Sequence, residues 1–133
     1  MLGEIIFAFA TIFGPPKMDR HNPNPALACA RAVLGKPRDV DTEILAVASY
    51  KLPCGARLRI CYGDRCVRAR VLDRGPQRAQ PDGPRENDID LSVGLARALG
   101  IGDKQGRTTC PNAHKYRGCP ITYTVDRYEP PRS

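Results

Sequence analysis

The strongest constraint on the fold is a pair of alternating segments that meet at a short turn. Arg57–Tyr62 and Arg65–Leu72 each alternate apolar and polar residues, and Gly63-Asp64 separates them. A two-residue turn that begins with Gly, placed between two such segments, is typical of a β-hairpin. In that register Cys61 and Cys66 face each other in a non-hydrogen-bonded pair, where Cα atoms approach closely. The sequence therefore predicts a Cys61–Cys66 disulfide.

The six cysteines of the 133-residue chain favour an oxidising setting and a disulfide framework. A second bond, Cys110–Cys119, would close the loop before the last expected strand. By elimination Cys29 would pair with Cys54, although spacing alone leaves the connectivity open. Zinc bound by Cys110, His114 and Cys119 is the competing interpretation, but the spacing is loose and no C-x-x-C pair exists. We expect three disulfides, no metal and no cofactor.

The rest of the pattern consists of short strands and short helices between turns, since the chain has 13 Pro and 12 Gly. We expect strands at Ile5–Phe13, Glu43–Ser49, Asp88–Asp90 and Ile121–Tyr128, and helices at Ala26–Leu34 and Val93–Leu99, the second capped by Ser92. Closure protects the edges of such short strands. The predicted fold is a mainly-β, disulfide-stabilised, six-stranded double-psi β-barrel with one or two short helices.

The length fits a single domain over 1–133, with the barrel over about 5–128 and a flexible tail at 129–133. No apolar stretch reaches the roughly 20 residues that a membrane span needs. Ile5–Phe13 follows Glu4 and lacks a basic flank, so it is a poor signal peptide. The formal charge of +7 attracts anionic partners. Because no recognition helix, basic tract or aromatic stacking motif accompanies it, we do not expect nucleic acid binding.

Several motifs follow one another along the chain: Phe9–Gly14 (FATIFG), Ala46–Pro53 (AVASYKLP), Gly55–Ile60 (GARLRI), Val71–Pro76 (VLDRGP), Asp88–Ser92 (DIDLS) and Ala96–Gly100 (ARALG). In this order they resemble the rare lipoprotein A family, whose members carry a double-psi β-barrel, as do expansins and barwin-like proteins. The D-R-G-P and I-D-L-S pair is the most specific part, and the resemblance spans about residues 5–128. It implies a groove across the barrel that holds a polysaccharide.

The resemblance also implies a role at bacterial cell-wall glycan. Some members are lytic transglycosylases that cut peptidoglycan where stem peptides are absent, whereas expansins loosen walls without evident hydrolysis. A lytic transglycosylase needs one carboxyl group that acts first as acid and then as base. Asp73 matches the D-R-G-P aspartate and is the expected general acid/base. Asp90 matches the I-D-L-S aspartate and would raise the pKa of a neighbouring carboxyl.

Structural roles are the alternatives for both aspartates. Asp73 would then satisfy backbone N–H groups in a turn, and Asp90 would cap the helix that follows it. For substrate binding the resemblance points to Thr11, which stands where expansins place a groove-lining threonine. Tyr50 offers an aromatic face to a sugar ring. Arg74 would bind a carboxylate or a glycan acid, or would lie on the surface without a role.

One departure from the family leaves enzymatic activity open. Catalytic members carry a histidine in an A-H-K-T-L-P run, and Ser49 occupies that position here. A non-catalytic module that binds wall glycan, or that serves as a structural part of a larger assembly, is therefore the alternative function. A bacteriophage tail-tip or baseplate component is one such assembly. The expected partners are peptidoglycan glycan strands, with other virion or cell-envelope proteins, in an extracytoplasmic location or a virion.

Overall fold

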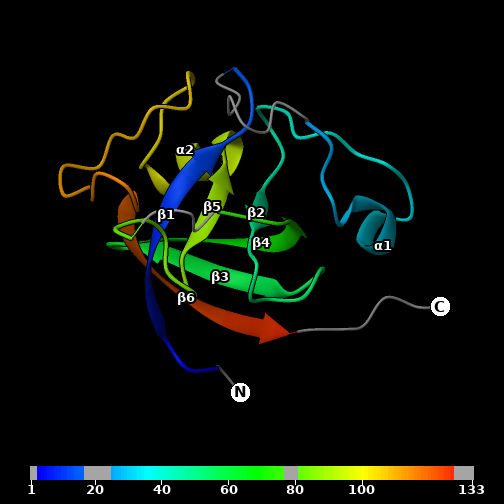
Figure 1. Ribbon diagram of the computed structural model, residues 1–133, viewed down its shortest axis with the longest axis horizontal. Coiled ribbons are helices and arrows are strands. Elements are labelled where there is room, and N and C mark those ends of the chain that lie inside the picture. Colours follow the sequence, from blue (N-terminus) through cyan, green and yellow to red (C-terminus); the bar gives the residue numbers. More distant parts are fainter. Residues whose placement is uncertain (1–2, 17–24, 77–80, 128–133) are drawn as a thin grey trace.

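Six strands close into a barrel in the order β1-β5-β2-β4-β3-β6 (Figure 1). The computed structural model describes residues 3–16, 25–76 and 81–127. Two short helices and three disulfides complete it, which confirms the expected mainly-β, disulfide-stabilised barrel. The elements are β1 (Ile6–Phe13), α1 (Ala30–Leu34), β2 (Ala46–Ala48), β3 (Arg57–Tyr62), β4 (Arg65–Asp73), β5 (Ile89–Ser92), α2 (Val93–Leu99) and β6 (Cys119–Arg127).

Two parallel pairs give the barrel its crossed topology. β1 runs parallel to β5 and β2 runs parallel to β4, whereas the other four pairings are antiparallel. Parallel neighbours need long crossover connections. Residues that are far apart in the sequence therefore lie in register, such as Thr11 opposite Asp90.

The hairpin of β3 and β4 has the register that the sequence predicted. Tyr62 lies opposite Arg65, and Cys61 lies opposite Cys66. Gly63 has a φ of 58° in the turn, which is a left-handed conformation that glycine adopts without strain. The Cys61–Cys66 disulfide, with its Cα atoms 4.1 Å apart, locks this end of the hairpin.

The other two disulfides are Cys29–Cys54 and Cys110–Cys119, the pairs favoured by elimination and by loop closure. Cys29 precedes α1 and Cys54 lies in the connection between β2 and β3, so this bond joins α1 to the barrel wall. Because all six cysteines are bonded, Cys110 and Cys119 are not available as metal ligands. Three disulfides are consistent with an oxidising, extracytoplasmic setting.

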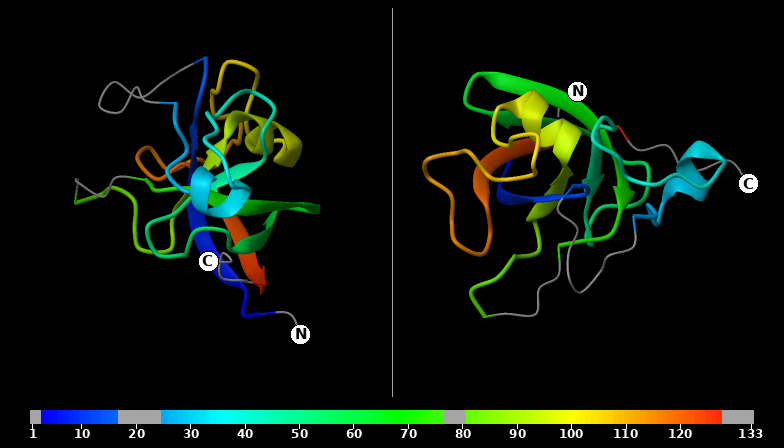
Figure 2. Two further views of the ribbon diagram at one scale, coloured as in Figure 1. Left: turned by 90° about the vertical axis from the view of Figure 1, so that its right-hand side faces the viewer. Right: turned by 90° about the horizontal axis from the view of Figure 1, so that it is seen from above.

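The main core fills the barrel and continues under α2. Leu58, Ile60 and Leu91 are fully buried inside the barrel, and Leu95 and Leu99 of α2 pack against them. A second, smaller apolar cluster lies outside the wall, where α1 and the segment that follows it cover β2 and β4. Figure 2 shows α1 projecting from the side of the barrel, apart from α2.

Several element boundaries differ from the sequence predictions. The first helix begins at Ala30 rather than Ala26, because Ala26 forms a bridge with Asp39 and Leu27 donates its N–H to the Arg38 carbonyl. The second strand shortens to Ala46–Ala48, and the last begins at Cys119. The expected end of the last strand at Tyr128 and the expected tail at 129–133 lie outside the described residues.

Ser92 precedes α2 as expected, but its side chain does not cap that helix. The hydroxyl donates to the Ile44 carbonyl at 2.6 Å and accepts the Ala46 N–H at 3.0 Å. It therefore ties β5 to the start of β2 across the barrel wall. Within the described part of the chain, no helix has the length and apolar character that a membrane crossing requires.

Loop length sets how strongly each disulfide stabilises the barrel. The Cys29–Cys54 bond joins residues 25 positions apart in the sequence, and the Cys61–Cys66 bond joins residues five positions apart. Loop-closure entropy then predicts losses of about 3.5 kcal/mol for Cys29→Ser/Cys54→Ser and about 2 kcal/mol for Cys61→Ser/Cys66→Ser. Urea denaturation of the two double variants measures both losses, and the reverse order would contradict the entropic account.

Candidate functional site

Four residues lie side by side across four neighbouring strands. Thr11 of β1 is opposite Asp90 of β5, which is opposite Ala48 of β2, which is opposite Asp73 of β4. We call this set the carboxylate row. Neighbouring strands are about 4.8 Å apart, so the two aspartate Cα atoms are about 10 Å apart. The fold thus brings together three of the residues that the sequence analysis selected from distant motifs.

The D-R-G-P and I-D-L-S motifs meet at Asp90. The Thr11 hydroxyl donates a hydrogen bond to Asp90 Oδ1. A Cβ atom added to Gly75 would lie 2.7 Å from Asp90 Oδ2 and 3.5 Å from the Ala48 Cβ. Any side chain at position 75 would therefore have to displace the Asp90 carboxylate from its present place, which links the glycine of one motif to the aspartate of the other. Asp90 does not cap α2, whose first turn contains no acidic residue.

Asp73 is half-buried at the end of β4 and connects two other segments. Its Oδ1 accepts the Ala28 N–H at 3.0 Å, and its backbone carbonyl accepts the Ser49 N–H at 3.0 Å. The N–H that it satisfies belongs to the segment before α1 rather than to its own turn. Asp73 therefore links α1 to the carboxylate row.

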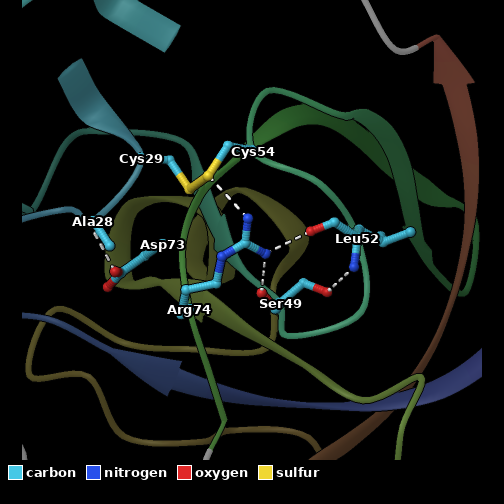
Figure 3. The surroundings of a disulfide bond; sticks show 7 residues. All are labelled: Ala28, Cys29, Ser49, Leu52, Cys54, Asp73 and Arg74. Atoms are coloured by element: carbon cyan, nitrogen blue, oxygen red, sulfur yellow. Dashed lines mark hydrogen bonds between the residues drawn. A yellow bond between two sulfur atoms is a disulfide. The ribbon is translucent and has the colours of Figure 1, made fainter. Parts of the chain in front are cut away.

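Arg74 is a structural clamp rather than a surface residue. Its Nη1 donates to the Ser49 carbonyl at 2.7 Å and to the Leu52 carbonyl at 2.6 Å. Its Nη2 lies 2.9 Å from Cys54 Sγ (Figure 3). The two terminal nitrogens, Nη1 and Nη2, thus hold the connection between β2 and β3, and the side chain is partly buried beside the Cys29–Cys54 disulfide. These contacts explain why an arginine follows Asp73.

The two remaining predicted residues differ sharply in exposure. Ser49, which stands at the position of the family histidine, is 1% exposed, and its hydroxyl accepts the Leu52 N–H at 3.0 Å. Its side chain is thus engaged within a turn and not presented to solvent. Tyr50, the next residue, is 46% exposed and lies two residues after Ala48 in the sequence.

The most buried ion pair among the described residues joins Asp88 and Arg117, to which the sequence analysis assigned no role. Asp88 accepts two hydrogen bonds from Arg117, at 2.7 Å from Nε and 3.0 Å from Nη2. It also accepts the N–H groups of Phe9 and Arg85 at 2.9 and 2.8 Å. The Asp88 side chain is 1% exposed and the Arg117 side chain 20%. The Arg117 guanidinium also lies 4.2 Å from the centre of the Phe9 ring, within cation–π range.

This pair shifts both ionisation equilibria. Burial alone would raise the pKa of the Asp88 carboxyl, but the hydrogen bonds from Arg117, Arg85 and Phe9 outweigh it and hold the pKa below 3.8. The carboxylate raises the pKa of Arg117 in return. Burial, with the nearby charges of Asp88 and Glu86, raises the pKa of Tyr123 to about 12, and its hydroxyl donates to the Asn87 carbonyl.

A sequence signal for Asp88 existed, because this residue opens the D-I-D-L-S run. Nothing in the sequence identified its partner, because Arg117 lies 29 residues further along in a loop and the chain has many other cations. The described residues contain no group of three His, Cys, Asp or Glu side chains that would hold a metal ion.

Comparisons with known proteins show the fold and not the family. No family model matches the chain, and no curated protein matches it. Among solved structures, the Streptomyces papain inhibitor (SPI) is similar to this chain, with a TM-score of 0.59 and 19% sequence identity. The similarity covers 95% of this chain and 97% of the inhibitor. At this identity the similarity shows a shared barrel fold and carries no inhibitory activity over to this chain.

The clamp role of Arg74 predicts an effect on stability. Arg74→Ala leaves the Ser49 and Leu52 carbonyls without their donor, so we expect the free energy of unfolding to fall by about 2 kcal/mol. Arg31→Ala, on the exposed face of α1, is the control and should change it by less than about 0.5 kcal/mol. Equal stability of the two variants in urea denaturation would rule out the clamp.

The lowered pKa of Asp88 predicts a dependence of stability on pH. A folded-state pKa below 3.8 means that the contribution of Asp88 is fully present above about pH 4 and is lost as the pH falls through the folded-state pKa. Asp88→Asn/Arg117→Met removes both charges together. We expect the difference in unfolding free energy between wild type and this variant to shrink from about pH 6 to about pH 2.5. A constant difference over this range, measured by denaturation, would argue against a charged Asp88.

Proposed function

We propose that the protein binds cell-wall glycan through the carboxylate row, as a member of the rare lipoprotein A group of double-psi barrels. The observation that carries the proposal is the register of Thr11, Asp90, Ala48 and Asp73 across four strands. Carboxylate oxygens accept hydrogen bonds from hydroxyl groups, and charged acceptors form the stronger bonds of this kind. Tyr50, two residues after Ala48, is exposed and would add an aromatic face for a sugar ring.

Two observations favour binding over cleavage. Hydrogen-bond donors already contact both aspartates, from Thr11 on Asp90 and from Ala28 on Asp73. Ser49, at the position of the catalytic histidine in the family, is buried within a turn.

Lytic transglycosylase activity is the second candidate, with Asp73 as general acid/base. The contact between Gly75 and Asp90 supports it, because the second carboxylate thereby lies against the D-R-G-P loop that follows Asp73. This reaction needs one carboxyl group that gives a proton to the leaving oxygen, and Asp73 is the carboxyl group that directly precedes this loop. The substrate of this reaction would be peptidoglycan strands without stem peptides.

One experiment separates the two candidates. Purified protein is incubated with peptide-stripped sacculi, bound protein is measured after sedimentation, and soluble fragments are identified by mass. We expect retention of the wild type, and retention of Asp73→Asn and Asp90→Asn weakened about tenfold each, as the loss of about 1.4 kcal/mol implies. Asp64→Asn, which removes the same charge at the exposed β3–β4 turn, is the control and should bind as wild type does.

The fragments decide between binding and cutting. Anhydro-sugar products released by the wild type and not by Asp73→Asn would establish cleavage. Retention without fragments supports the binding function. If the wild type fails to sediment with sacculi and releases nothing, the proposal is wrong.

A further inference from the structure

The outer face of the β3–β4 hairpin carries an ordered group of arginines. Arg57 lies opposite Arg70 and Arg59 lies opposite Arg68, and we call these four residues the arginine array. Leu58 and the other residues that alternate with them on the two strands point into the barrel core, so the array points outward. Three of its members are exposed and Arg70 is half-buried.

The register places the four charges close together. Cys61–Cys66 is a non-hydrogen-bonded pair, and every second pair from it is of the same kind, so both arginine pairs have Cα atoms only about 4.5 Å apart. Along each strand the arginines are two residues apart, about 7 Å. The disulfide at the end of the hairpin holds this register covalently. The backbone positions of the four arginines are therefore fixed relative to one another.

Such an arrangement is unfavourable without a counter-charge. Like charges directly opposite each other destabilise a sheet. In the part of the chain that the structure describes, one ion pair involves the array, between Arg68 Nε and Asp126 Oδ2 at 3.4 Å. Arg68 is 78% exposed, so this pair contributes little. One carboxylate among four guanidinium groups leaves the face strongly positive.

We propose that the arginine array binds a polymer of repeated phosphate groups that carries no bases. Guanidinium groups bind phosphate through two parallel hydrogen bonds. Two arginines 7 Å apart on a strand can engage separate phosphates of one chain, so that weak contacts add up along it. The face is open and exposed, which suits an extended polymer better than a single enclosed anion.

The outward positions also distinguish between phosphate polymers. Besides the four arginines, the outward positions of β3 and β4 between Arg57 and Arg70 hold the Cys61–Cys66 disulfide. None of them is aromatic. Proteins that bind single-stranded nucleic acid stack bases on aromatic side chains, and duplex readers insert a helix or ribbon into a groove. The array thus offers positive charge but no aromatic side chain on which a base could stack, which suits a phosphate polymer without bases.

The array is separate from the carboxylate row, and its ligand does not depend on the glycan function. Arg70 stands three residues before Asp73 on β4, about 10 Å along the strand. Apart from this shared strand, the row lies on β1, β5 and β2, whereas the array lies on β3. A phosphate polymer without sugar rings therefore tests the array alone.

The test measures binding of fluorescently labelled poly(glycerol phosphate) by anisotropy at several salt concentrations. We expect Arg59→Ser/Arg68→Ser to weaken binding at least about tenfold and to lower the slope of log affinity against log salt by about 1.5. Arg59→Lys/Arg68→Lys should keep the slope but bind more weakly than wild type, because lysine lacks the bidentate fork. Arg31→Ser/Lys36→Ser, which removes the same charge around α1, should bind within about threefold of wild type.

Several outcomes would overturn the proposal. They are absence of binding by the wild type, equal losses in the array and α1 variants, and equal or tighter binding of single-stranded DNA with the same number of phosphates. Because the serine variant relieves repulsion, its unfolding midpoint should not fall, which excludes misfolding as the cause of weaker binding. Asp73→Asn should bind the polymer as wild type does, so a failed glycan function leaves this result unaffected.

Discussion

The arrangement of the barrel depends on the hydrogen bonds that the buried carboxylate of Asp88 accepts. It accepts the Phe9 N–H from β1, the Arg85 N–H from its own turn and two bonds from Arg117 in the loop before β6. These contacts fix how β5 pairs with β1. A slip of one residue would turn every side chain of β5 to the opposite face. Asp90 would then no longer lie beside Thr11.

Because the Asp88–Arg117 ion pair is buried, it stabilises the fold only if its hydrogen-bonding geometry is good. An ion pair removed from water is favourable only when its geometry is good and its remaining atoms are hydrogen-bonded. Asp88 meets this condition, because the backbone N–H groups of Phe9 and Arg85 supplement the two bonds from Arg117. Among the described residues Arg74 has no carboxylate partner, and the backbone carbonyls of Ser49 and Leu52 accept hydrogen bonds from its guanidinium instead. The chain thus uses arginine for two different purposes, internal clamping and surface charge.

The proposed activities occupy different parts of the barrel wall. The carboxylate row lies where the two parallel pairs meet, and the arginine array lies on the outer face of the β3–β4 hairpin. The first location depends on crossed connections that bring β1, β5, β2 and β4 together. The second depends only on a local hairpin and its disulfide.

The sequence alone determined the features that arise from neighbours along the chain. Two-residue alternation and a glycine turn defined the β3–β4 hairpin, its register and the Cys61–Cys66 bond. The helix at Val93–Leu99 followed from its glycine stop. Apolar character alone does not locate a side chain, because Phe7 belongs to the apolar strand β1 and is nevertheless 80% exposed.

Only the tertiary structure decided which distant residues meet. The motif order suggested that Asp73 and Asp90 belong together, but their positions on either side of Ala48 depend on strand pairings that no local pattern specifies. The partners of Asp88, Arg74 and Ser92 were equally hidden from the sequence. Local periodicity records which face of a strand is buried, whereas the crossed closure of the barrel sets which strands become neighbours.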